Sequence, residues 1–229
     1  KSGQGNPHPV SPWGMPTNLA NGLIRGLLVP SLMMLVLFAA FGKSRGQPVR
    51  PYAASIIYFA CLGFGFIAVE LALLQQLTLL LGHPIFTLSV LLFTLLAAGG
   101  IGSALSHRVS ARAACVVVAV LGAAEAAALP LLVPALLPLS LAARVAIATS
   151  LVAPLGLAMG VPFPRGLEQT GRGPLPAPPF YWGLNGVMSV MGSVTTVFVA
   201  MVLGFQAAML VGCACYVLAA VAARPALGG

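Results

Sequence analysis

Long apolar runs separated by short polar breaks dominate the sequence. Seven such runs can be drawn, at residues 22–41, 53–81, 84–105, 113–129, 141–160, 181–203 and 206–223. A helix needs about 20 apolar residues to cross the hydrocarbon core of a bilayer. The runs lack the alternation of barrel strands, and a helix satisfies its own backbone groups within lipid. The pattern therefore predicts an all-α fold, a polytopic transmembrane helix bundle of about seven spanning helices.

The breaks also suggest how the chain is divided. Residues 1–19 are rich in Pro, Gly, Asn and Ser, which predicts an irregular extramembrane segment or linker. Residues 20–224 form the predicted transmembrane helical domain, and 225–229 form a C-terminal tail. Because the chain starts at Lys1 without an initiator Met, we expect it to be a piece of a longer or processed polypeptide.

The fourth run is the weakest of the predicted spans. It has the fewest residues and is followed by Pro130, Pro134 and Pro138. Proline removes a backbone hydrogen bond inside a helix. We therefore expect this helix to end near Leu129 or to kink there.

Composition excludes a soluble globular domain. Charged residues make up 6% of the chain, against about 25% in soluble domains. The net charge of +8 does not indicate nucleic-acid binding, because the cations punctuate the apolar runs instead of forming one patch. We expect the lipid bilayer to be the main partner and no nucleic acid to bind.

The positions of the cations predict the topology. Eight of the eleven Lys and Arg residues follow odd-numbered runs, namely Lys43, Arg45, Arg50, Arg108, Arg112, Arg165, Arg172 and Arg224. Cytoplasmic loops carry an excess of Lys and Arg. The pattern therefore predicts an N-terminus outside and a C-terminus in the cytoplasm.

Glu70 is the main candidate for an intramembrane polar site. It lies well inside the second run, where a charge is costly and needs a partner or a function. Gln75 and Gln76 lie one to two turns further on, and Asn185 and Ser189 share a polar face of the sixth run. One interpretation makes Glu70 a protonated or hydrogen-bonded acid that clamps helices, which the cost of buried charge favours. The other makes it a proton or cation site.

A tight corner is predicted between the second and third runs, at Gly82, His83 and Pro84. Gly82 suits the end of one helix and Pro84 the first turn of the next. One interpretation makes the His83 imidazole a pH-sensitive or ligand-binding group. We favour a role in capping the last backbone carbonyls of the corner.

Glu125 and Arg144 form a candidate structural ion pair. If the fourth helix ends near Leu129, Glu125 lies about one turn from its end. Arg144 then lies one turn into the next helix at a similar depth. If the fourth helix runs on to Leu137, the depths differ and the pair fails.

Small residues predict where helices pack closely. Such residues let helix backbones approach in lipid. Candidates for packing positions are Gly63, Gly99, Gly102, Ser103, Gly192 and Ser193.

No cofactor and no metal are expected. Cys213 and Cys215 point about 200° apart on a helix, so they do not chelate one ion. A retinal protein needs a lysine within a helix, and both lysines lie outside the runs. A bis-histidine haem needs matching depths, whereas His83 and His107 fall at opposite membrane faces.

Four ordered motifs resemble the membrane portion of the spermidine-synthase-like, aminopropyltransferase-fused bacterial polytopic membrane proteins. They are Gly63-x-Gly65-Phe66…Glu70…Gln75…Leu81-Gly82-His83-Pro84, then Gly100-Ile101-Gly102-Ser103 with Ser106 and Arg108, then Pro154-Leu155-Gly156…Gly160-Val161-Pro162-Phe163-Pro164-Arg165-Gly166, and Trp182-Gly183-x-Asn185-Gly186-x-x-Ser189-Val190-x-Gly192-Ser193. Gln76 departs from the basic residue expected there. The resemblance implies a bacterial inner membrane and a synthase-like domain upstream, which should be cytoplasmic, whereas the cations place residue 1 outside.

Aminopropyl transfer needs acids that hold a polyamine and a glycine-rich turn for the nucleoside. With three Glu and no Asp, we do not expect this chain to be that enzyme. Our hypothesis is a non-catalytic membrane subunit or anchor that scaffolds a larger assembly with other membrane subunits, or an upstream synthase-like domain. The alternative is a transporter-like module for a cation or polyamine that uses Glu70.

Overall fold

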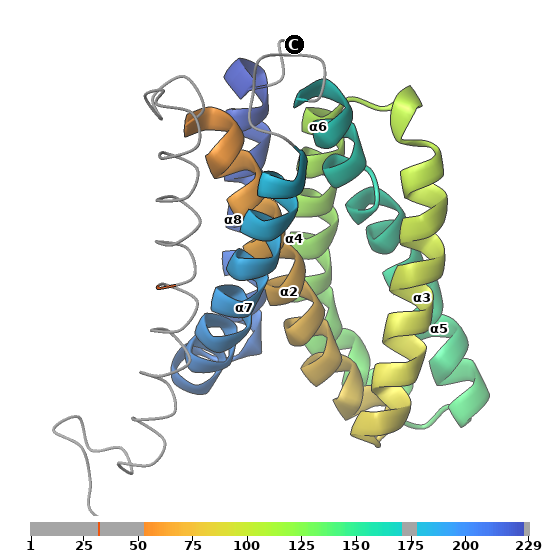
Figure 1. Ribbon diagram of the computed structural model, residues 1–229. Helices are drawn as coiled ribbons and strands as arrows, with labels where there is room; N and C mark the ends of the chain where they lie inside the picture. The colour runs from red at the N-terminus through yellow and green to blue at the C-terminus, as the bar shows by residue number, and fades with distance from the viewer. Residues whose placement is uncertain (1–31, 33–52, 171–177, 227–229) are drawn as a thin grey trace, which may run out of the picture.

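The computed structural model describes residues 32, 53–170 and 178–226 (Figure 1). Its elements are α2 (Ala53–Leu81), α3 (Pro84–Ala104), η2 (Ser106–Arg108), α4 (Ala111–Leu136), α5 (Leu141–Met159), α6 (Pro162–Thr170), α7 (Pro178–Leu203) and α8 (Phe205–Ala226). Within the described residues, six helical segments are long and apolar enough to cross a membrane, with α5 and α6 counted as one. The predicted all-α bundle is confirmed, and the chain is a multi-pass integral membrane protein.

Some predicted segments lie outside the described residues. They are the N-terminal segment 1–19, nearly all of the run 22–41 and the connection at 171–177. Within the run 22–41, only Leu32 is described, and it is helical and exposed. Of the predicted tail, the structure describes only the first two positions, where α8 ends.

The predicted end of the fourth helix near Leu129 is wrong, because α4 continues to Leu136 through Pro130 and Pro134. Proline at 130 leaves the Ala126 carbonyl without its i+4 donor. The side chain of Gln206 on α8 supplies that donor, with Nε2 at 3.2 Å from the Ala126 oxygen. A contact from a distant part of the chain therefore offsets the local cost of the proline.

The fifth run also continues further than predicted. After a break at Gly160, a second short helix, α6, begins at Pro162. Proline is tolerated in the first turn of a helix, where its missing N–H has no partner in any case. Arg165 and Glu168 then pair across one turn of α6, with Nη1 and Oε2 at 2.6 Å.

The helix α2 is at the centre of the bundle. It packs most extensively against α8 and α7, while α4 packs against α8 and α3 pairs with α5. Helices α2 and α3 meet at the corner after Leu81 and diverge from there toward the opposite end (Figure 1). Helices α3 and α5 thus form one group, and α2, α4, α7 and α8 form another. The two groups contact each other at the corner and, through α6, at the opposite end.

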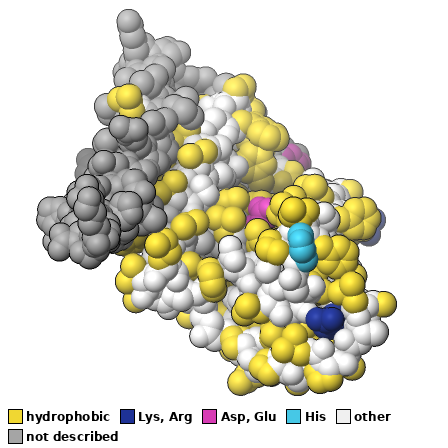
Figure 2. Space-filling view, turned by 90° about the horizontal axis from the view of Figure 1, so that it is seen from below, with side chains coloured by type: hydrophobic (Ala, Val, Ile, Leu, Met, Phe, Trp, Pro, Cys, Tyr) yellow, Lys and Arg dark blue, Asp and Glu magenta, His cyan; other side chains and the backbone are white. Residues whose placement is uncertain are grey.

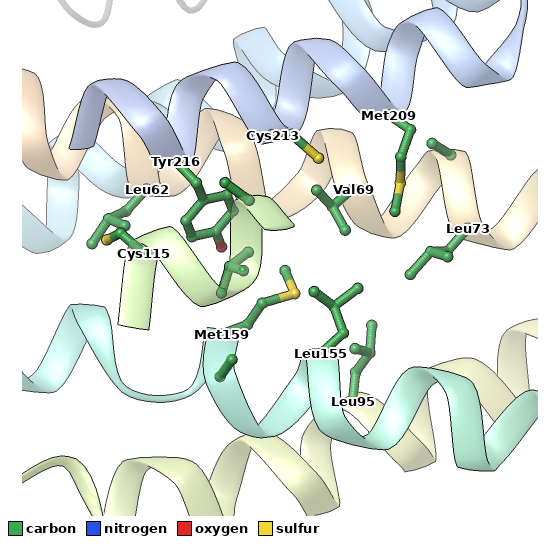
Figure 3. Close-up of a cluster of buried hydrophobic side chains, with 14 of the residues drawn as sticks. Leu62, Val69, Leu73, Leu95, Cys115, Leu155, Met159, Met209, Cys213 and Tyr216 are labelled. Atoms are coloured by element: carbon green, nitrogen blue, oxygen red, sulfur yellow. The ribbon is translucent and has the colours of Figure 1, made fainter. Parts of the chain in front are cut away.

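One apolar core fills the space between the central helices. Figure 3 shows side chains that point into it from five helices, including Leu73 of α2, Leu95 of α3, Cys115 of α4, Leu155 of α5 and Tyr216 of α8. Lipid is as apolar as these side chains, so close packing of the helices, and not the exclusion of water, favours their association. On the end of the molecule near the corner, hydrophobic side chains are spread over the described surface, with few charged side chains among them (Figure 2).

Aromatic rings join three helices at the opposite end. Phe59 stacks on Tyr181 with ring centroids 4.4 Å apart, and its edge meets Phe163 of α6 at 5.6 Å. Phe163 also contacts Trp182, which is largely exposed. Trp and Tyr are enriched at membrane interfaces, and the exposed Trp182 at this end of the bundle fits that preference.

Candidate functional site

The seam between α2 and α7 depends on glycine. A Cβ added at Gly63 would overlap the backbone carbonyl of Asn185. A Cβ at Gly192 would come within 2.6 Å of Ile67 and 3.0 Å of the Phe64 oxygen. Both glycines occupy the close helix contact predicted for them.

A second seam joins α3 and α5. A Cβ at Gly102 would overlap the Leu157 carbonyl, and one at Gly160 would overlap the carbonyl of Gly99. Ser103 lies at the edge of this seam, where it is exposed and lines a cavity. The sixth predicted packing residue differs, because the Ser193 hydroxyl donates to Val190 of its own helix at 2.8 Å.

The polar stripe on α7 donates to the backbone of α2. Asn185 Nδ2 lies 3.4 Å from the Phe59 carbonyl oxygen, and Ser189 Oγ lies 3.0 Å from that of Gly63. Both pairs differ by 126 in residue number, which fixes the register of these parallel helices. The same offset places Thr196 level with Glu70.

The five residues of the predicted polar site do not form one cluster. Glu70 is partly buried and has no hydrogen bond or ion pair to another described residue. The α2 carbonyls that Asn185 and Ser189 contact belong to residues 11 and 7 positions before Glu70, or about 10 to 16 Å along the axis. The nearest group by register is Thr196, whose buried hydroxyl has no partner.

The two glutamines face different surroundings. Gln75 is exposed, whereas Gln76 is 5% exposed and neither polar atom of its amide has a hydrogen-bond partner among the described residues. Gln76 lines a cavity of about 350 Å³ with residues from the ends of α4 and α7 and the start of α8. It is therefore separate from Glu70 and part of a different site.

At the corner between α2 and α3, the chain turns at Gly82 and Pro84 as predicted. Gly82 adopts φ +83°, a conformation that glycine favours, and Pro84 begins α3. His83 is the N-cap residue, but its side chain makes no cap hydrogen bond. The carbonyl of His83 instead accepts from the amide and the hydroxyl of Thr87, both at 2.9 Å. The absent cap bond concerns the first amides of α3, so the predicted capping of the last α2 carbonyls by the imidazole stays a prediction.

The predicted pair of Glu125 with Arg144 does not form. Arg144 Nη1 donates to the backbone oxygen of Leu80 at 2.7 Å. The physical reason is the extra length of α4, since Glu125 lies 11 residues before Leu136, about 16 Å from that end. Glu125 is buried among described residues, and its Oε2 has no hydrogen-bond partner.

Besides the bond from Arg144 to Leu80, two polar contacts between helices were not predicted from the sequence. The Tyr58 hydroxyl donates to the Pro162 carbonyl of α6 at 2.7 Å, and Gln206 donates to Ala126. A proline in the fourth run does indicate that Ala126 needs a donor. Which residue supplies it depends on the packing of α8 against α4.

A larger cavity, of about 450 Å³, lies between the two groups of helices. Its lining is mostly apolar, with Phe66 of α2, Leu96 of α3 and Phe163 of α6. Ser103, Asn185 and Tyr216 are its polar side chains. Glu70 lines neither this cavity nor the one at Gln76.

The cysteines separate onto two helix contacts. Cys213 faces Gly122 of α4, and Cys215 faces Gly65 of α2. All four cysteines are free, and the described residues hold no cluster of three or more metal-ligating side chains. The C-x-C pair therefore packs two helices against α8.

Comparisons of the chain with protein-family models, with curated proteins and with solved structures find no match.

Proposed function

We propose that this chain is a non-catalytic integral membrane subunit or anchor, which scaffolds a larger membrane assembly or an upstream synthase-like domain. The observation that carries the proposal is the use of its polar side chains. Tyr58, Arg144, Asn185, Ser189 and Gln206 each donate to a backbone carbonyl of another helix. These side chains therefore hold the helices of the bundle together.

The contacts connect most of the described helices. They join α2 to α5, α6 and α7, and α4 to α8. Hydrogen bonds between membrane helices contribute about 0.6 kcal/mol on average and up to about 2 kcal/mol each. Together with the glycine seams they favour one fixed arrangement, which suits an anchor. Alternating access would need one group of helices to move against the other.

Glu70 supports the presence of a partner. It lies three residues from the middle of α2, so it is close to the bilayer midplane. Acids at this depth face protein or water-filled space and not lipid. A polar group of another membrane subunit that packs against the partly exposed side of Glu70 would give the acid a protein partner in place of lipid.

The sequence motifs extend the proposal to a family. They favour the membrane half of the spermidine-synthase-like proteins, in the bacterial inner membrane. The cation pattern favours an N-terminus outside and a C-terminus in the cytoplasm. Identification of the partner tests the proposed family, and cysteine labelling tests the proposed orientation.

Native mass spectrometry of the gently solubilised protein from its own membrane tests the scaffold function. We expect the chain to appear with other membrane subunits at fixed stoichiometry. Glu70→Gln should reduce that association, while Gln75→Leu, five residues further along α2, should not. A chain that is found alone at every detergent concentration contradicts the proposal.

A transporter-like module for a cation or polyamine is the second candidate. The specific observation in its favour is Glu70, a midplane acid without a bonded partner among the described residues. Uptake of radiolabelled spermidine into proteoliposomes tests it. Transport that disappears in Glu70→Gln and survives in Gln75→Leu would favour this candidate over the scaffold.

A further inference from the structure

The cavity at Gln76 combines an apolar lining with an unpaired amide. Its walls come from the last turns of α2, the end of α4 and the turn between α7 and α8, where Gly204 adopts φ +87°. Leu79, Leu129, Val133 and Phe205 are among its apolar lining residues, and Gln206 is a second amide in the lining. The space, about 350 Å³, is in the range of small-molecule sites.

Without a ligand, the buried amide of Gln76 lowers the stability of the folded protein. A buried polar group with no hydrogen-bond partner costs about 1 to 3 kcal/mol. Both the donor Nε2 and the acceptor Oε1 of Gln76 lack partners, although the residue is 95% buried (5% exposed). An amide presents a donor and an acceptor side by side, so its complement is a group that accepts and donates at neighbouring atoms.

The part of α4 that lines the cavity contains a backbone acceptor without its usual helical donor. Pro134 has no N–H, so the carbonyl of Pro130 lacks the i+4 donor that the helix normally supplies. Both prolines line the cavity. A ligand with an additional hydroxyl therefore finds an acceptor there.

The charge and depth of the site narrow the class of ligand. The residues that line the cavity include no charged side chain, which disfavours phosphate and carboxylate heads. Gln76 lies five residues before the end of α2, about 7 to 8 Å along the axis, which matches the level where lipid ester and glycerol groups meet the hydrocarbon. The apolar walls suit an acyl chain.

We propose that this cavity, with Gln76 at its polar end, binds an uncharged glycerolipid-type amphiphile whose hydroxyl and ester carbonyl pair with the Gln76 amide. A monoacylglycerol has this chemistry. The inference does not depend on the scaffold function, because it concerns α2, α4 and α8 and not the surface at Glu70.

Binding of 1-oleoylglycerol to the purified full chain in lipid nanodiscs tests the proposal, with native mass spectrometry as the readout. We expect Gln76→Leu to weaken binding about tenfold or more, since two hydrogen bonds are lost. The neighbouring Gln75→Leu is the matched control and should bind as the unmodified protein does. Methyl oleate, which lacks the hydroxyls, and an oleoyl lysophosphatidic acid, which carries a phosphate, should bind weakly to all three.

Two further measurements keep the test decisive if Gln76→Leu perturbs the fold. Val133→Trp fills the cavity from α4 without changing the amide, and it should also abolish binding. The thermal unfolding temperature of Gln76→Leu without ligand should equal or exceed that of the unmodified protein, because an unpaired buried amide is removed. Added 1-oleoylglycerol should raise this temperature only where Gln76 is present.

Three results would overturn the proposal. Equal binding of 1-oleoylglycerol to Gln76→Leu and Val133→Trp would place the lipid elsewhere. No binding to the unmodified protein would mean that water alone occupies the cavity. A large loss of stability in Gln76→Leu without ligand would show that the amide has a structural partner.

Discussion

Arg144 shows how a cation within a membrane protein can act without an acidic partner. The last carbonyls of a helix have no donor from within that helix. Arg144, in the first turn of α5, donates to Leu80 one residue before α2 ends. A charged donor at the negative end of a helix is favourable twice, through the hydrogen bond and through the helix dipole.

We therefore expect Arg144→Met to destabilise the protein by about 1.5 to 3 kcal/mol, the range for hydrogen bonds to charged groups. Methionine keeps much of the apolar stem, so the loss reports mainly the bond to Leu80. Thermal unfolding in detergent measures it. Arg112→Met is the control, because Arg112 is exposed on α4 and should change stability little; equal losses in both variants would contradict the assignment.

The effects of Gln206 and Pro130 on stability should be coupled, because both concern the hydrogen bond to the Ala126 carbonyl. Gln206→Met should cost about 1 kcal/mol, since it leaves the Ala126 carbonyl without a donor. In Pro130→Ala the new backbone N–H bonds Ala126 directly. The same Gln206→Met change should then cost clearly less.

A double-mutant cycle measures this coupling by the free energy of unfolding. The four proteins are the unmodified chain, each single variant and the double variant. Strict additivity of the two changes would show that Gln206 does not serve the carbonyl that the proline releases.

At the scale of elements, the seams set the distances between helices. In α3, Gly102 and Gly100 are two residues apart but differ in surroundings, since a Cβ at Gly102 would overlap Leu157 while one at Gly100 meets nothing within 4 Å. Gly102→Ala should therefore destabilise the bundle by about 1 to 3 kcal/mol, the usual effect of overpacking. Gly100→Ala should be neutral or slightly stabilising, because alanine favours helix.

Unfolding of both variants in one detergent checks this prediction. The comparison removes the effect of helix propensity, which is the same at the two positions. A Gly102→Ala protein as stable as Gly100→Ala would show that α3 and α5 are not held at the described separation.

The sequence predicts elements better than it predicts contacts. The bounds of α2 are as expected, because apolar length and the Gly82 corner are local properties. The end of α4 is not, because the cost of Pro130 is offset by Gln206, 80 residues away. Likewise, the polar face of Asn185 and Ser189 is visible in the sequence, but its register on α2 is set by packing of the seam. The grouping with Glu70 fails for that reason.

At the scale of the whole molecule, three of the four cations whose side chains are described lie at one end. Arg108, Arg112 and Arg165 belong to η2, α4 and α6, which meet where α3 and α5 end (Figure 1). Arg144 lies beside the end of α2, at the opposite end. Cations are therefore more frequent at the end that holds Arg108, Arg112 and Arg165. Under the positive-inside rule, this is the end proposed to face the cytoplasm.

Labelling of single cysteines tests this orientation. In a background with the four native cysteines changed to alanine, His83→Cys and Ser110→Cys place thiols at opposite ends, since both positions are exposed. A membrane-impermeant maleimide should label His83→Cys in right-side-out vesicles and Ser110→Cys only in inverted ones. The cysteine-free background should stay unlabelled in both. The reverse pattern would place the cation-rich end outside, and it would remove the conflict between the charge-based topology and a cytoplasmic synthase-like domain before residue 1.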